Sequence, residues 1–360
     1  MKRIHLTILL MMTTLLIVGC LQHTYEISVL PNERIDVAYE LKGDKVEIYG
    51  REYLLPDTHM WEVERFTTVE DEDSLDVIFA MATTDYEKYR YIFNWDKVAP
   101  DSIHLDVSSL VEKHSQLLGN AYQFQFTFHN RRFNELYGNQ WDYIPEECHI
   151  LDNDELSGLL TSVEVERLEK MFSLGILQWN KSRFEKAMER IWDIFKSENI
   201  TQGIDTSETV FSIVFAGWID DLHSYLNELD FVDPNYVNLD WWDDLRPLFL
   251  GRLIDAVGYD YAARLMEISE AIESEYQLTR NLQEDQFSVH LQLPGRITKT
   301  NASKDKDRSL AYWSISGKEF MDEDVTLYAV SFEPLWTRIA IIILLFIVFI
   351  SILIRRIIKK

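Results

Sequence analysis

Polar and apolar residues alternate along several short stretches in the first 130 residues of the chain. The clearest runs from Tyr122 to Phe128, where four aromatic residues occupy every second position. Such alternation gives a strand with one buried and one wet face, typical of an antiparallel sheet. Comparable runs separated by turn residues predict further strands at 25–30, 36–41, 45–54, 60–69, 75–83 and 90–95. Residues 108–118 are expected to form a short helix over this sheet.

Between residues 152 and 280 the apolar residues recur with a helical period. Two capping boxes, Thr161 with Glu164 and Ser182 with Glu185, predict two helix starts. The second helix carries one apolar stripe: Phe184, Ala187, Met188, Ile191, Trp192 and Phe195. A third helix is expected to open near 205–208, with 210–219 as the buried centre of the block. Two more are expected at 242–257 and 259–276.

Alternation returns from Phe287 to Leu293 and ends at Pro294-Gly295, where glycine is free to adopt a positive φ. Two more strands are predicted at 310–316 and 325–332. The order sheet, helices, sheet predicts an α+β fold, in which an antiparallel β-sheet domain carries a large helical insertion. The expected boundaries are 20–150 for the first β-rich part, 151–285 for the helical block and 286–333 for the return to the sheet.

The carboxyl-terminal segment is almost entirely apolar. Residues 339–354 are nearly all Ile, Leu, Val and Phe. With the residues just before them, they reach the roughly 20 residues that a bilayer requires, so 335–355 is predicted to be a transmembrane helix. Trp336 and Arg338 are expected at the outer interface and Arg355 and Arg356 at the inner one, where a basic cytoplasmic tail at 356–360 begins. A buried soluble helix is the alternative, although the segment has no polar face.

The first twenty residues have the layout of a signal peptide. Met1-Lys2-Arg3 precedes an apolar run that ends in Gly19 and Cys20. The quartet Ile17-Val18-Gly19-Cys20 resembles the bacterial lipoprotein signal, which implies that 1–19 is removed and that Cys20 is acylated. An ordinary secretory signal followed by a chance cysteine is the other interpretation.

The two predicted anchors constrain each other. The roughly 314 residues between them would form a body with a radius of gyration of about 20 Å. A body of that size is too small to cross a periplasm easily and reach a second membrane. We therefore expect the lipid and the helix to enter the same membrane, with the ectodomain outside the cytoplasm. In a Gram-negative cell this is the inner membrane; in a Gram-positive cell it is the cell surface.

The charge of the chain restricts its partners. The formal net charge is −25, and the segment between the two ends carries 28 basic against 60 acidic residues, or −32. Such a surface repels nucleic acid and favours cations, basic partners or solubility alone. Arg131-Arg132 is the one local basic pair in the body. It could meet a phosphate or a carboxylate, but ion pairs with neighbouring acids are its expected use.

The sequence contains no recognisable catalytic constellation. It has no phosphate-binding loop, no nucleophile elbow and no histidines at metal-ligand spacing, so no catalytic residue, metal or cofactor is assigned. With Cys20 acylated, Cys148 is expected to be a free buried thiol, unpaired with the adjacent His149. The aromatic, acidic stretch at 240–244 could stack a sugar or hold a cation, but a helix start with inward tryptophans is the simpler interpretation.

The last seventy residues resemble a family of bacterial envelope proteins. Leu293-Pro294-Gly295-Arg296-Ile297, then Asn301 and Tyr312-Trp313-Ser314-Ile315, then strand, Trp and apolar helix, look like the end of the LppM-like lipoproteins. That resemblance implies a membrane-anchored, β-rich ectodomain linked to lipid or glycolipid binding. The helical block departs from the simple pattern of that family.

These features together favour a non-enzymatic envelope lipoprotein that binds a lipid, a glycolipid or a protein partner. Two alternatives remain open. One is a hydrolase of cell-envelope glycans that uses paired carboxylates as acid and base. The other is a scaffold that recruits a basic partner through its negative charge.

Overall fold

The computed structural model describes residues 21–44, 48, 61–70, 73–93, 105–152, 158–198, 211–218, 241–303 and 309–358. The chain divides into two compact units. Met1–Arg131 together with Gln277–Lys360 form one, here the sheet unit, and Arg132–Tyr276 form the other, the helical unit. The predicted α+β class, an antiparallel β-sheet domain interrupted by helices, is confirmed.

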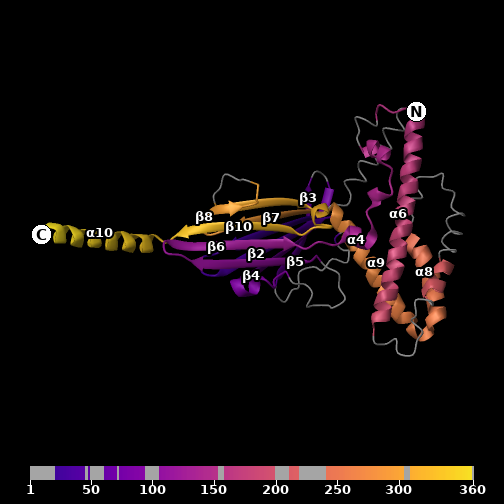
Figure 1. Ribbon diagram of the computed structural model, residues 1–360, viewed down its shortest axis with the longest axis horizontal. Coiled ribbons are helices and arrows are strands. Elements are labelled where there is room, and N and C mark those ends of the chain that lie inside the picture. Colours follow the sequence, from indigo (N-terminus) through magenta and orange to yellow (C-terminus); the bar gives the residue numbers. More distant parts are fainter. Residues whose placement is uncertain are drawn as a thin grey trace. The chain divides into compact units, whose positions relative to one another are not determined.

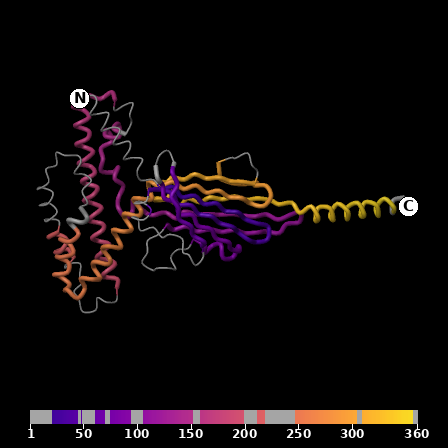
Figure 2. Tube along the Cα trace, turned by 180° about the vertical axis from the view of Figure 1, so that it is seen from behind, coloured from indigo at the N-terminus to yellow at the C-terminus, as the bar shows by residue number. Residues whose placement is uncertain are grey.

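The sheet unit contains two sheets. The larger has the order β3 (Glu62–Glu70), β4 (Asp73–Asp85), β2 (Arg34–Gly43), β1 (Gln22–Val29), β7 (Gln286–Gln292) and β9 (Leu310–Ser316). The smaller has the order β5 (Val107–Ser115), β6 (Gly119–Phe128), β10 (Val325–Pro334) and β8 (Arg296–Thr300). Neighbouring strands are antiparallel except β1 and β7, which run side by side in the same direction. Figures 1 and 2 show the strands from opposite sides.

Aromatic rings fill the space between the two sheets. The predicted alternation on β6 places Phe124, Phe126 and Phe128 on its buried face, and all three are fully buried. Phe126 lies 5.4 Å from the ring of Tyr25 on β1, and Phe128 lies 5.3 Å from that of Phe287 on β7. The sheets therefore pack face to face through ring contacts in the tilted and edge-on geometries that aromatic pairs prefer.

Several strand predictions need correction. Residues 108–118 are not a helix: most of them belong to β5, where Val107, Ser109 and Val111 alternate inward opposite β6. The predicted strand at 90–95 is a set of turns as far as residue 93: after the short helix α3 (Tyr86–Tyr89), the N–H groups of Tyr91 and Ile92 donate to the carbonyls of Lys88 and Tyr89. β8 lies in a stretch for which no strand was predicted. Residues 45–54, apart from 48, lie outside the described residues.

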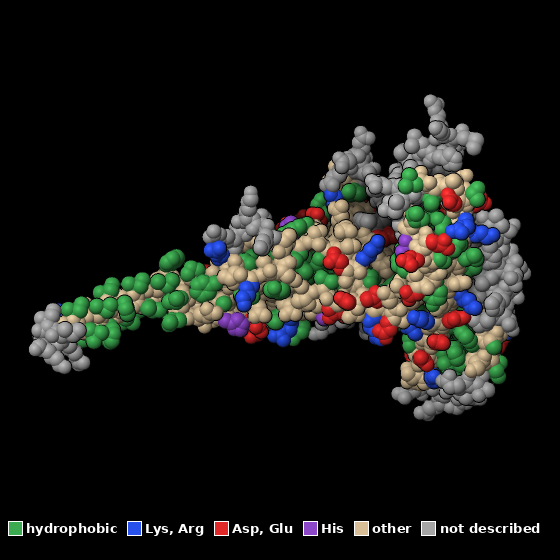
Figure 3. All heavy atoms as spheres, turned by 45° about the horizontal axis from the view of Figure 1, so that its top comes forward, with side chains coloured by type: hydrophobic (Ala, Val, Ile, Leu, Met, Phe, Trp, Pro, Cys, Tyr) green, Lys and Arg blue, Asp and Glu red, His purple; other side chains and the backbone are tan. Residues whose placement is uncertain are grey.

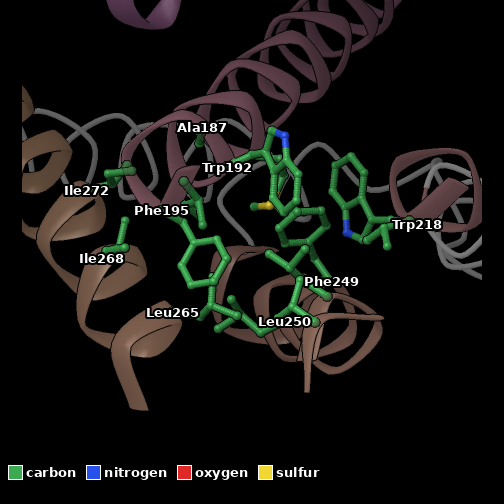
Figure 4. Close-up of a cluster of buried hydrophobic side chains, with 14 of the residues drawn as sticks. Ala187, Trp192, Phe195, Trp218, Phe249, Leu250, Leu265, Ile268 and Ile272 are labelled. Atoms are coloured by element: carbon green, nitrogen blue, oxygen red, sulfur yellow. The ribbon is translucent and has the colours of Figure 1, made fainter. Parts of the chain in front are cut away.

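The helical unit is built around one long helix. Its elements are α4 (Phe133–Tyr137), the short 3-10 helices η2 (Gln140–Asp142), η3 (Glu146–Asp152) and η6 (Tyr259–Tyr261), the long helix α6 (Ser162–Ser197), residues 211–218, α8 (Trp241–Val257) and α9 (Ala262–Glu284), which continues into the sheet unit. All six residues of the predicted apolar stripe are buried on α6. They meet Trp218, Phe249 of α8 and Leu265 of α9 in one core (Figure 4).

Two helix predictions were only partly right. The capping box at Thr161 and Glu164 is present, whereas Ser182 and Glu185 open no helix because α6 continues through them. The Ser182 hydroxyl instead accepts a hydrogen bond from the Tyr143 hydroxyl at 2.8 Å. In the third predicted helix, residues 211–218 bury Val214 and Trp218 but leave Ile213 exposed. This helical segment therefore lies on one side of the core and not at its centre.

Candidate membrane-anchoring site

The carboxyl-terminal helix α10 (Trp336–Ile358) is long and apolar enough to cross a bilayer. Its stretch Trp336–Arg355 has 20 residues and a mean hydropathy of 2.9, and none of it is buried. Twenty helical residues rise about 30 Å, the thickness of a bilayer's hydrocarbon core. A core helix of a soluble protein would be covered by its neighbours, whereas apolar side chains are exposed along α10 (Figure 3). The length and composition of α10 thus fit the predicted span at 335–355.

The first turn of α10 is attached to the sheet unit. Only Leu335 separates β10 from the helix, and its N–H donates to the carbonyl of Leu118, in the turn between β5 and β6, at 3.0 Å. The Arg338 guanidinium donates to the Ser115 hydroxyl at 3.3 Å and to the Gln116 carbonyl at 3.0 Å. Figures 1 and 2 both show α10 leaving the end of the sheets where β10 ends. We call that end of the sheets the α10 end.

The predicted interface residues lie near the two ends of α10. Trp336 projects from the first turn of α10 with 74 % of its surface exposed. Arg338 holds the β5–β6 turn through the two hydrogen bonds just described, a role that the sequence did not reveal. Arg355 is exposed near the other end of the helix, and the Arg356 side chain lies outside the described residues.

The turn between β1 and β2 lies at the α10 end as well. Lys113, two residues before the end of β5, donates from its Nζ to the carbonyl of Pro31 and to the carboxylate of Glu33, both at 3.1 Å. Tyr122, the fourth residue of β6, donates from its hydroxyl to the Glu333 carboxylate at 2.8 Å. Burial and the nearby Glu333 carboxylate together raise the pKa of Tyr122 to about 12.

The first described residue lies at the opposite end of the sheets. The Leu21 N–H donates to the Asp285 carboxylate at 3.0 Å, and its carbonyl accepts from the Gln286 N–H at 3.0 Å. His23 contacts the same carboxylate at 3.3 Å, and both His23 and Asp285 are buried. Because β1 and β7 are parallel, both begin at this far end and run toward α10.

This arrangement fixes where a lipid on Cys20 would emerge. Cys20 and the signal segment 1–19 lie outside the described residues, but Cys20 is bonded to Leu21, which is fully buried against Asp285. The eight residues of β1 span about 26 Å at 3.3 Å per residue, so the two predicted anchors leave from opposite ends of the sheets.

Cys148 and His149 do not form a catalytic pair. Cys148 is free and buried in the helical unit, as predicted, and its thiol donates to the carbonyl of Leu168 at 3.6 Å. Burial raises the pKa of this thiol, the opposite of what a nucleophilic cysteine requires. His149 is exposed, and its ring contacts that of Trp141 instead.

The remaining polar candidates serve the fold. Arg132 pairs with Glu135, as predicted, and Arg131 donates to the Thr279 hydroxyl at 3.1 Å. In the described part of the chain, no group of three or more His, Cys, Asp or Glu side chains is placed to hold a metal ion. The side chains of the acidic, aromatic stretch at 240–244 lie outside the described residues.

Sequence reasoning missed the residues that join α10 to the sheet. Leu117 and Leu118 were assigned to the end of a helix, although Gly119-Asn120 directly after them is a turn signal. Asp285 and His23 come together only because β1 pairs with β7 across more than 250 residues. No local pattern carries that information.

Comparisons with known proteins leave the family of the chain open. No family model matches it, and no curated protein matches it. A similar solved structure is the NMR structure of the folded domain of LppM from Mycobacterium tuberculosis, with 6 % sequence identity and a TM-score of 0.32. The likeness covers 88 % of this chain and 92 % of that chain. A TM-score of this size is too low to show a shared fold.

Proposed function

We propose that the protein is a membrane-anchored envelope protein that displays its two units outside the cytoplasm to bind a partner, without catalysis. The observation that carries this proposal is α10, an uncovered apolar helix of bilayer length joined to the sheet unit by a single residue. The basic residues after it favour a cytoplasmic carboxyl end. Acylation of Cys20 remains part of the proposal.

The separation of the two anchor points adds a condition to the single-membrane hypothesis. A lipid on Cys20 begins within one residue of Leu21, about 26 Å along β1 from the α10 end. It reaches the bilayer that α10 crosses only if the sheets lie along the membrane surface. If Cys20 is a chance cysteine after a secretory signal, the sheets are free to stand upright on α10.

The distribution of charge favours a protein partner with a basic surface. The helical unit, Arg132–Tyr276, contains 30 acidic and 11 basic residues, a net charge of −19. Attraction over such a surface steers a cationic partner and weakens as salt is added. We therefore place the recruiting surface on the helical unit.

Binding of a lipid between the two sheets receives no support from the packing. The interior there is occupied by rings in mutual contact, such as Tyr25 with Phe93 and Phe124 with Trp313. A lipid or glycolipid ligand would have to bind elsewhere on the protein.

The glycan-hydrolase alternative is also not favoured. Its general acid would need a raised pKa. The described carboxyl groups with displaced pKa values are Asp85, Glu135, Glu164, Glu198 and Asp324, and all are shifted downward by hydrogen bonds to the charged form. Each of them serves as a helix cap, an ion-pair partner or a loop brace.

Reversal of charge on the helical unit tests the proposed function. Glu166 and Glu169 are exposed on α6, and replacing both with Lys changes the net charge by four. The control is Glu62→Lys with Glu64→Lys, an equal change on exposed positions of β3. We expect proteins that co-purify with the native full chain from its own membranes at low salt to be lost from the α6 variant and retained by the control. Equal retention by both variants, or complexes that resist high salt, would contradict the proposal.

A further inference from the structure

The turn between β5 and β6 presents two leucines to the outside. Ser115 and Asn120 are the last paired residues, and the Gln116 N–H donates to the Gly119 carbonyl at 2.8 Å, which closes the turn. The two residues at its tip, Leu117 and Leu118, are 76 % and 45 % exposed. Tight turns normally carry Gly, Pro, Asn, Asp or Ser at such positions. Nothing in the local fold of the hairpin requires leucine here.

This tip is held beside the beginning of α10. The Leu118 carbonyl accepts a hydrogen bond from the Leu335 N–H, and the Arg338 guanidinium donates to Ser115 and Gln116, the two residues before the tip. Gly119 permits the close approach: a Cβ on it would lie 2.2 Å from the Glu333 carbonyl oxygen. Trp336 adds a third large exposed side chain to the same place. Apolar surface thus continues from the helix onto the hairpin.

We propose that Leu117, Leu118 and Trp336 form a collar that inserts into the headgroup and acyl boundary of the bilayer that α10 crosses. This inference rests on the proposed function, because it takes α10 as a membrane span. Tryptophan is enriched at that depth, and leucines on a short loop gain from leaving water there. Two neighbouring insertions, helix and hairpin tip, resist rocking of the sheet unit about Leu335 better than the helix alone.

Depth measurements on the full chain test the collar. A nitroxide label is attached to Leu117→Cys in a Cys20→Ser, Cys148→Ala background, so that the new thiol is unique. The protein is reconstituted into phosphatidylcholine and phosphatidylglycerol vesicles. The aqueous control is Val69→Cys, an apolar position on β3 that is 70 % exposed. The membrane control is Leu345→Cys, in the middle of α10.

The collar predicts more frequent collisions with oxygen and less frequent collisions with a water-soluble nickel complex at 117 than at 69. If the label at 117 behaves like that at 69 while that at 345 is in the bilayer, the collar is overturned and the anchor stands. A label at 117 that is shielded from both reagents indicates contact with protein and overturns it too. A label at 345 that is open to water removes the proposed anchor, and the collar with it.

Discussion

The apolar residues of α10 set how many charged residues the helix can carry and still insert into a membrane. Between Trp336 and Arg355 the helix has fourteen Ile, Leu, Val and Phe residues. On the insertion scale each contributes about −0.3 to −0.6 kcal/mol near the helix centre, which totals about −4 to −8 kcal/mol. An arginine at the centre costs about 2.5–3.5 kcal/mol on the same scale.

One central arginine should therefore be tolerated and two should not. Leu345→Arg changes the insertion free energy by about 3–4 kcal/mol, which leaves it favourable or close to zero. Leu345→Arg with Phe346→Arg changes it by about 6–8 kcal/mol, which is as large as the apolar contribution of about 4–8 kcal/mol that drives insertion. The matched control is Leu353→Arg with Ile354→Arg, where the side chains reach the interface beside Arg355 at lower cost.

The assay is extraction of cell membranes with alkaline carbonate, which releases proteins that do not span the bilayer. In every variant, residues 1–20 are replaced by an ordinary cleavable secretory signal, so that neither a lipid on Cys20 nor an uncleaved signal segment can hold the chain in place of α10. The single central variant and the control pair should stay with the membranes, and the central pair should appear in the supernatant. Membrane retention of the central pair, or release of the control pair, would refute the account of α10 as an anchor.

Three further outcomes are expected. First, a donor dye is placed on Glu323→Cys, an exposed site just before β10 at the far end of the sheets, in a Cys148→Ala background. An acceptor dye in the bilayer should quench this donor more strongly when Cys20 is present than when residues 1–20 are replaced by an ordinary cleavable secretory signal. Equal quenching would mean that no lipid holds that end down. Second, Gly295→Ala should lower the free energy of unfolding of the sheet unit by more than about 2 kcal/mol, because the φ of Gly295 is +76° and an added Cβ would lie 2.3 Å from the Phe332 carbonyl oxygen. The control, Gly251→Ala in α8, has open space around it and should raise the free energy of unfolding by about 0.5–1 kcal/mol, as measured by thermal unfolding. Third, hydrogen bonds from the Asn130 N–H and side chain, and then from His129, lower the pKa of Asp324. The stability that Asp324 contributes is present above its unfolded pKa and is lost as the pH falls through its folded pKa. The difference in Tm between the native chain and Asp324→Asn should therefore be largest at neutral pH and vanish in strong acid. A difference that is constant with pH would contradict this reasoning.

Where the sequence was sufficient, the period of the apolar residues decided the structure. The rings of β6 and the stripe on α6 are buried as their spacing requires, and both patterns are long enough to be unambiguous. The α+β class follows from the order of such patterns along the chain. The anchor-like composition of α10 was equally plain.

Where the sequence misled, short segments were assigned by local chemistry alone. β5 has polar residues on both faces and buries Ser109, whose hydroxyl donates to the Tyr89 carbonyl, so its alternation is weak. A capping-box pattern at Ser182 is overridden because α6 packs as one continuous helix. The parallel pairing of β1 with β7, which sets the separation of the two ends, depends on the whole topology and has no sequence signature.

The sidedness of the chain tests the central claim most directly. Val163 is exposed on α6, and Lys360 is the last residue after α10. Single cysteines are introduced at 163 or at 360 in a Cys20→Ser, Cys148→Ala background. Cells whose outer envelope layers have been removed, with the membrane that α10 crosses left intact, are then treated with a membrane-impermeant maleimide. An α10 that spans the membrane predicts labelling at 163 at once and at 360 only after lysis. Labelling of both positions from the same side would contradict the claim.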